Sequence, residues 1–231
     1  MRVHQAKRLV EEETSTYDSI ASHFSQTRYG AGPFLNELAK DVPSDADILD
    51  IGCGNGRLVE ALPKKVTYTG IDVSKKLLAL SKELHPERKG SFHLFDGTSL
   101  EFGDEIFSHI YMLASFHHMP KPLQQEFINE CARILKKDGK IIMTVWHLWR
   151  MPFIKYLLYS LPTKLLSRKV DLSDIYVPWK DKQGTILASR YFHMFRKREI
   201  ETLFRRAGFK NVEVELVSLK KQKNYLVTAN K

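Results

Sequence analysis

The stretch Ile48-Leu49-Asp50-Ile51-Gly52-Cys53-Gly54-Asn55-Gly56 decides the fold class of this 231-residue chain. A short apolar run passes into three glycines spaced two residues apart, and a helical pattern over residues 57–62 follows. This order is typical of a buried strand, a tight turn and a helix. Glycines in such a turn let a ligand approach the backbone without a Cβ in the way. The stretch therefore predicts a ligand site where the strand ends.

The glycine spacing separates two classes of nucleotide site. A dinucleotide-binding loop needs the pattern Gly-x-Gly-x-x-Gly, whose third glycine packs the helix against the strand. Here the pattern is Gly-x-Gly-x-Gly, position 57 is Arg, and Asp50 precedes the glycines. Such a loop favours a ligand that carries a cationic amino acid group in place of a pyrophosphate.

Strand and helix patterns alternate on both sides of this loop. Apolar and β-branched runs predict strands over residues 48–51, 66–73, 91–95, 106–113 and 140–146. Helical spacing fills the gaps, with Ser74 placed to cap one helix and Gly139 as the expected stop of another. After a helix that ends at Gly208, two strand patterns predict a terminal hairpin. We expect an α/β fold with a mostly parallel seven-stranded sheet and an antiparallel C-terminal hairpin.

Acidic residues follow two further strands of this sheet. Asp72 ends the second strand, where a carboxylate can accept both hydroxyls of a ribose, and Asp96 follows the third, where an adenine amino group would arrive. Together with Asp50, Gly52 and Gly54, they make residues 45–146 resemble the Rossmann-like class I S-adenosylmethionine-dependent methyltransferases. The residues that this resemblance places at the S-adenosyl-L-methionine cofactor are Asp50, Gly52, Cys53, Gly54, Gly56, Asp72, Val73, Asp96, Gly97 and Ala114.

Motifs outside the glycine loop resemble a narrower family, the tRNA wobble-uridine methyltransferases that esterify 5-carboxymethyluridine. The matching segments are residues 17–29 (YDSIASHFSQTRY), 114–118 (ASFHH), 145–146 (VW), 190–195 (RYFHMF) and 224–227 (NYLV). They cover nearly the whole chain except residues 147–189. The resemblance implies a tRNA anticodon loop as partner and, as in eukaryotic members, a small zinc-binding activator subunit.

The chemistry that this resemblance implies suits the available side chains. A carboxylate acceptor has a pKa near ~4, so it is ionised at neutral pH and needs neither a general base nor a metal ion. Arg28 and Arg190 are expected to hold the carboxymethyl group or the adjoining phosphate, because guanidinium offers two donors to either. The expected catalytic residues are Arg28, His117, Arg190 and His193, with His118 left structural. The expected substrate or RNA contacts are His23, Tyr29, Trp146, Lys164, Arg168, Lys169 and Tyr191.

Several of these residues have a second interpretation. For His23 and His193, a site role and hydrogen-bonded packing are equally compatible with the sequence. Tyr29 and Tyr191 could stack on a flipped uracil. Cys53 is most simply a small packing residue.

The positive charge is concentrated in one part of the chain. Residues 150–210 hold 14 Lys and Arg against 5 Asp and Glu, whereas the other 170 residues hold 22 of each sign. Aromatic and basic residues alternate over 147–189, which favours a lid that also contacts RNA. Two alternatives are a lid that only packs on the domain and an amphipathic membrane-surface helix, which Pro152 and Pro162 would limit to about nine residues.

The remaining features predict one methyltransferase domain in four parts. These are an N-terminal helical cap (1–44), the cofactor-binding core (45–146), the lid insertion (147–189) and a C-terminal helix and hairpin (190–231). No apolar run reaches the ~18 residues of a membrane span, and the first residues do not form a signal peptide. Two cysteines exclude a disulfide framework, so we expect a cytoplasmic protein without stable membrane association. The alternatives are a small-molecule carboxyl or ring methyltransferase and a non-catalytic S-adenosylmethionine-binding RNA module.

Overall fold

The computed structural model describes residues 1–28, 30–151, 153–158, 171–219 and 222–231. Seven strands form one sheet in the order β3-β2-β1-β4-β5-β9-β8, and β6 and β7 pair separately. The strands are β1 (Asp47–Ile51), β2 (Thr67–Asp72), β3 (Phe92–Leu94), β4 (Phe107–Leu113), β5 (Leu135–Trp146), β6 (Asp174–Lys180), β7 (Ile186–His193), β8 (Lys210–Leu219) and β9 (Gln222–Asn230). The predicted sheet is thereby confirmed, including the terminal hairpin.

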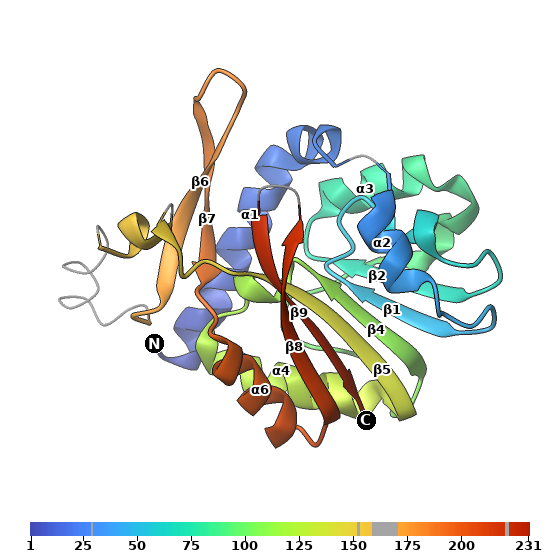
Figure 1. The fold of residues 1–231 in the computed structure, drawn as a ribbon. Helices are drawn as coiled ribbons and strands as arrows, with labels where there is room; N and C mark the ends of the chain where they lie inside the picture. Colours follow the sequence, from blue (N-terminus) through green and yellow to red (C-terminus); the bar gives the residue numbers. More distant parts are fainter. Residues whose placement is uncertain (29, 152, 159–170, 220–221) are drawn as a thin grey trace.

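The first five strands of the sheet are parallel, and β9 runs antiparallel to both β5 and β8. Figure 1 shows helices on both sides of this sheet. The α-helices are α1 (Val3–Gln26), α2 (Gly32–Ala39), α3 (Lys75–Leu84), α4 (Lys121–Ile134) and α6 (Lys197–Arg206). Three 3₁₀ turns join them, which are η1 (Arg57–Ala61), η2 (Pro86–Ser91) and η3 (Phe116–His118).

Both faces of the central strands are buried. Along β1, Leu49 belongs to an apolar cluster with α4 and α6, and its neighbour Ile48 to a second cluster on the opposite face. Successive side chains of a strand point to opposite faces, so a strand covered on both sides is apolar at nearly every position. Asp50, a charged residue in this buried strand, is the exception that the sequence had singled out.

Local signals account for most of the element boundaries. Ser74 caps α3 as predicted, because its Oγ accepts a hydrogen bond from the Leu77 N–H at 3.1 Å. Two boundaries differ from the prediction. The helix expected over residues 57–62 is only the 3₁₀ turn η1, and β5 begins at Leu135, before Gly139, with Asp138 in the left-handed region at φ 62°.

The hairpin β6–β7 was not foreseen in the lid insertion. Figure 1 shows it standing away from the seven-stranded sheet, beside α1. Because β7 spans residues 186–193, the domain boundary predicted at 189/190 falls inside this strand. Residues 153–158 are helical, and no helix among the described residues is long and apolar enough to cross a bilayer.

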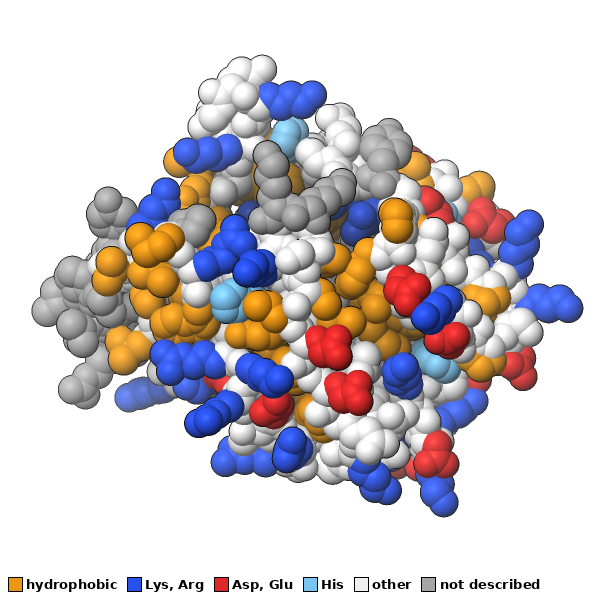
Figure 2. Space-filling view, viewed as in Figure 1, with side chains coloured by type: hydrophobic (Ala, Val, Ile, Leu, Met, Phe, Trp, Pro, Cys, Tyr) orange, Lys and Arg blue, Asp and Glu red, His pale blue; other side chains and the backbone are white. Residues whose placement is uncertain are grey.

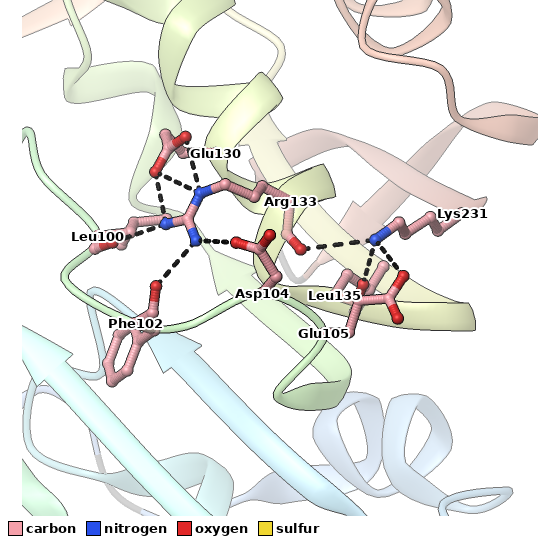
Figure 3. A network of polar contacts seen from close by, with 8 residues as sticks. All are labelled: Leu100, Phe102, Asp104, Glu105, Glu130, Arg133, Leu135 and Lys231. Atoms are coloured by element: carbon pink, nitrogen blue, oxygen red, sulfur yellow. Dashed lines mark hydrogen bonds and ion pairs between the residues drawn. The ribbon is translucent and has the colours of Figure 1, made fainter.

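A network of polar contacts anchors the end of the chain at the edge remote from the glycine loop (Figure 3). Arg133 of α4 donates to the backbone oxygens of Leu100 and Phe102 and to the Asp104 carboxylate, at 2.6 to 3.2 Å. Lys231 Nζ donates to the Leu135 oxygen at 2.7 Å. These bonds fasten the loop before β4 to the end of α4, and the residue after β9 to the start of β5.

Candidate functional site

The glycine loop forms the floor of a cavity at the carboxyl ends of β1, β2 and β4. Gly52 and Gly54 have φ angles of +74° and +58°, a region that side chains disfavour. A Cβ on Gly52 would lie 2.5 Å from the Ser115 Cβ, so the loop packs directly on the segment after β4. A Cβ on Gly54 would meet only Phe24, at 3.6 Å, and would project into the cavity.

Asp72 fixes the shape of this loop from the end of β2. Its Oδ2 accepts the Gly54 N–H at 2.8 Å, and its Oδ1 accepts the Ser74 N–H at 2.9 Å. The residue is 6% exposed, and burial raises the pKa of its carboxyl although both backbone bonds lower it. Each oxygen retains a free lone pair, so the carboxylate can still accept ribose hydroxyls.

The cavity occupies about 1080 Å³, part of which is open to solvent. Its walls are mainly apolar, and Asp72 stands among them as a carboxylate acceptor. Apolar walls with one buried carboxylate acceptor suit a nucleoside ligand such as S-adenosylmethionine. The predicted cofactor residues that line the cavity are Gly52, Gly54, Asp72, Val73, Gly97 and Ala114.

Four predicted cofactor residues lie outside the cavity lining, namely Asp50, Cys53, Gly56 and Asp96. Asp50 accepts a hydrogen bond from the Tyr68 hydroxyl at 2.9 Å, and burial raises the pKa of its carboxyl to about 7. Asp96 is exposed and accepts the backbone N–H groups of Thr98 and Ser99, both at 2.7 Å. Partial burial would raise the pKa of Asp96, but these bonds lower it overall. Both carboxylates thus have local partners in the fold.

His117 lines the same cavity from η3, the 3₁₀ turn that follows β4. Its ring is buried, stacks on Phe192 at 5.0 Å, and accepts the Trp146 N–H at Nδ1 over 3.3 Å. Burial, with nearby His118, Arg190 and Arg28, holds the pKa of His117 well below its usual value. The imidazole is therefore neutral and, with Nδ1 accepting, carries its proton on Nε2.

Arg190 is an almost fully buried cation on the same wall. It is 4% exposed, and its guanidinium lies 4.6 Å from the Trp179 ring centroid, 5.1 Å from Phe192 and 5.6 Å from Trp146. It forms no ion pair with any described carboxylate, and its Nε is buried without a hydrogen-bond partner. Aromatic faces stabilise a cation, and the Tyr17 hydroxyl is a hydrogen-bonding neighbour of this guanidinium. Arg190 is thus prepared for an anion in the cavity.

Arg28 reaches the cavity from the end of α1. The Asn55 side chain of the glycine loop donates to the Arg28 backbone oxygen at 3.1 Å, which ties the helix end to the loop. Burial and the nearby cations Arg57 and Arg190 lower the pKa of Arg28, and its Nε also has no partner among the described residues. A half-buried guanidinium that senses the charge of the buried Arg190 favours an anionic ligand between them.

His118 is held by two hydrogen bonds, as a structural residue would be. Its Nδ1–H donates to the Tyr191 oxygen at 2.7 Å, and its Nε2 accepts from the Tyr17 hydroxyl at 2.8 Å. Burial raises the pKa of Tyr17, despite the Arg190 charge that lowers it. The pair locks α1 against η3 and β7 beside the cavity.

The alternation of β7 separates the remaining predicted residues. Arg190 faces the cavity, whereas Tyr191 and His193 do not line it. His193 is 0% exposed, and its ring nitrogens bond Asp174 at 2.8 Å and Glu199 at 3.0 Å. Burial lowers the pKa of His193, but both carboxylates outweigh it and raise the value to about 9.

Two further predicted contacts have different surroundings. His23 accepts the Trp179 indole N–H at 2.8 Å, which docks the hairpin on α1 without placing His23 in the cavity lining. Trp146 does line the cavity. Tyr29, Lys164, Arg168 and Lys169 lie outside the described residues, so their predicted roles stay predictions.

Comparisons with known proteins agree with this geometry. A family model described as a methyltransferase domain matches residues 49–143. The Schizosaccharomyces pombe tRNA (carboxymethyluridine(34)-5-O)-methyltransferase is 29% identical over 83% of this chain and 86% of its own length. The enzyme of the same name from Saccharomyces cerevisiae is 30% identical over 64% of this chain. The chain is an S-adenosylmethionine-dependent methyltransferase.

Solved structures show the same fold. A SAM-dependent methyltransferase from Methanosarcina mazei has a TM-score of 0.67 at 22% identity, over 88% of this chain and 99% of its own. Burkholderia thailandensis 1,6-didemethyltoxoflavin-N1-methyltransferase has a TM-score of 0.66 at 16% identity, over 100% and 91%. The curated relatives differ in length. The match to this chain covers 53% of the Saccharomyces cerevisiae protein and 31% of the one from Arabidopsis thaliana.

Three of the residues that sequence reasoning missed bear on the chemistry of the site. Arg57 lines the cavity, and its signal was the cation that interrupts the dinucleotide pattern. Glu13 also lines it, one helical turn before Tyr17 on the same face of α1. Trp179 contacts Arg190 from a hairpin that no local pattern had indicated.

Proposed function

We propose that this methyltransferase esterifies the carboxylate of a 5-carboxymethyluridine at the wobble position of tRNA. The relatives from both yeasts bear that activity in their names, and their similarity supports a tRNA substrate. The observation that carries the proposal is Arg190, a buried guanidinium without a carboxylate partner among the described residues. A buried charge is costly unless it is paired, so its natural partner is an anion of the substrate.

The cavity offers separate groups for the cofactor and the acceptor. Asp72 would accept hydrogen bonds from the ribose of S-adenosylmethionine, and the Gly54 backbone would lie against the ligand. When bound, this cofactor supplies an electrophilic methyl group on a sulfonium. The loop and Asp72 are held in place by one another, so the binding geometry is formed before the ligand arrives.

The acceptor groups orient a nucleophile that is already ionised. Arg190 and Arg28 would each donate to the carboxylate or to a neighbouring phosphate, and the His117 Nε2–H would donate to a substrate oxygen. Orientation is the contribution that such an attack needs, because a carboxylate requires no deprotonation at neutral pH. The neutral state of His117 fits this task, because a neutral donor lowers the nucleophilicity of the carboxylate less than a cationic donor would.

The surface around the site suits a polyanion. The exposed basic residues of the described lid and C-terminal regions are Lys155, Lys180, Lys182, Arg196, Lys197, Arg198, Arg205, Arg206, Lys210 and Lys223. In Figure 2, blue side chains gather over α6 and near the hairpin. We propose that this surface contacts the anticodon stem-loop by charge, and that the protein acts in the cytoplasm. The small zinc-binding activator subunit expected from the family resemblance stays part of this proposal.

Labelled S-adenosylmethionine tests the reaction directly. We expect methyl transfer to tRNA that carries 5-carboxymethyluridine, and release of methanol from the product in mild alkali. We also expect a rate that is nearly flat from pH 6 upward, because the nucleophile is already ionised. An alkali-stable product would contradict esterification. Transfer only to a small-molecule extract would favour the small-molecule alternative, and cofactor binding without any transfer would favour the non-catalytic RNA module.

A further inference from the structure

Three charged side chains of the cavity wall each contain a buried polar atom without a hydrogen-bond partner among the described residues. These atoms are Arg28 Nε, Arg190 Nε and Glu13 Oε2. The two arginines suit the substrate anion proposed above. Glu13 does not, because a carboxylate repels an anion. A buried acceptor without a donor is destabilising, so its presence in the cavity wall requires another explanation.

The position of Glu13 is fixed from both sides. Its Oε1 accepts the Tyr191 N–H at 2.7 Å, which ties the α1 carboxylate to the β7 residue that follows Arg190. Its Oε2 lies 3.4 Å from His118 Nδ1, but that N–H is directed to the Tyr191 oxygen at 2.7 Å. The side chain is 8% exposed, so bulk water reaches it poorly. One carboxylate oxygen is thus bound to the fold, and the other is buried without a donor among the described residues.

We propose that Glu13 Oε2 accepts a hydrogen bond from the N3–H of the substrate's uracil ring. This inference rests on the proposed function and adds the residue that selects the base. Arg190 would bind the anionic substituent, while Glu13, bound to the backbone of the next residue in β7, reads the ring edge. Uracil carries an imide N–H at position 3, whereas neutral cytosine presents a lone pair there, which would face the carboxylate without a proton between them.

Two anticodon stem-loop oligonucleotides test the proposal, one carrying 5-carboxymethyluridine and the other its N3-methyl derivative. For the wild type we expect kcat/KM to fall about 10- to 100-fold on the N3-methyl substrate, the range of a hydrogen bond to a charged group. Glu13→Gln should lower kcat/KM by a similar factor on the N3–H substrate and change little on the N3-methyl one. Its amide oxygen can still accept the Tyr191 N–H, while its NH₂ faces the ring.

Glu12→Gln is the matched control, because Glu12 is the exposed neighbour on α1. We expect both activities and cofactor affinity to be unchanged in this variant. The ratio of the two substrates within one variant does not depend on the folded fraction, so a partly unfolded Glu13→Gln protein is still informative. An unchanged ratio in Glu13→Gln would overturn the role of Glu13 and leave the esterification standing. A wild-type enzyme inactive on the N3–H oligonucleotide would overturn both.

Discussion

The two halves of the cavity are built on different principles. At the glycine loop, polar groups are satisfied within the fold, since both Asp72 oxygens accept backbone N–H bonds. On the wall made by α1 and β7, Arg28, Arg190 and Glu13 retain polar atoms that no described group satisfies. The first half is preorganised for one ligand common to the enzyme class. The second half is destabilised by its unpaired charges, and this cost is offset only when a complementary acceptor binds.

The largest effect is expected in the satisfied half. Gly54→Val should reduce cofactor binding below detection, because the side chain would enter the cavity at a backbone φ of +58°. Calorimetric titration with S-adenosylmethionine measures this loss. Gly184→Val is the control, since Gly184 has a φ of +89° but a Cβ there would meet no atom within 4 Å. If both variants bound the cofactor equally well, the loop would not be its floor.

Arg190→Lys tests the unsatisfied half. We expect kcat on tRNA to fall roughly 100-fold while cofactor affinity stays within a factor of about three, because an ammonium cannot reproduce a two-donor fork. Single-turnover rates and calorimetry separate the two quantities. Arg196→Lys is matched to it, since Arg196 lies 4.2 Å from the Trp149 ring centroid but is exposed and outside the cavity lining. Equal losses in both variants would show that the cavity position of Arg190 is irrelevant.

A smaller effect is expected at the surface. Charge reversal at Arg205 and Arg206, both exposed at the end of α6, should lower the slope of log affinity for tRNA against log salt by about 2, or about 0.9 for each phosphate contact. Filter binding over a salt series measures the slope. The pair Lys64 and Lys65, exposed before β2, gives the matched reversal and should leave the slope nearly unchanged. The same slope in both double variants would place the RNA elsewhere.

The sequence predicted the satisfied half better than the unsatisfied one. The glycine loop, Asp72 and the Ser74 cap are local signals, because each residue's task is set by neighbours a few positions away. The Glu13 carboxylate, in contrast, bonds a backbone group 178 positions along the chain. No spacing rule reports such a contact, so Glu13 was not singled out.

The β6–β7 hairpin is a second feature that local sequence patterns did not predict. Prolines and basic residues over 147–189 obscured the alternation of β6, and the strand pairing of Val177 with Arg190 joins the lid to the region that follows it. The alternation within β7 then separates Arg190 from His193. The sequence analysis grouped these two as site residues because it did not recognise β7 as a strand, whose alternation places them on opposite faces.

The smallest expected effect concerns His193, which the structure places outside the cavity lining. Its folded pKa of about 9 lies above the unfolded value of about 6.5, so its stabilising pairs with Asp174 and Glu199 are fully present below pH 6.5. That stability, on the order of 3 kcal/mol, is lost as the pH rises from 6.5 through 9. The midpoint temperature of thermal unfolding should fall over this pH window for the wild type. It should not fall for His193→Gln. Asp50, whose folded pKa is about 7, loses its contribution mainly below the window, so the difference between the two proteins isolates His193. Unchanged cofactor affinity and turnover per folded molecule in His193→Gln would assign this residue to the hairpin's attachment, whereas a fall in turnover alone would return it to the acceptor site.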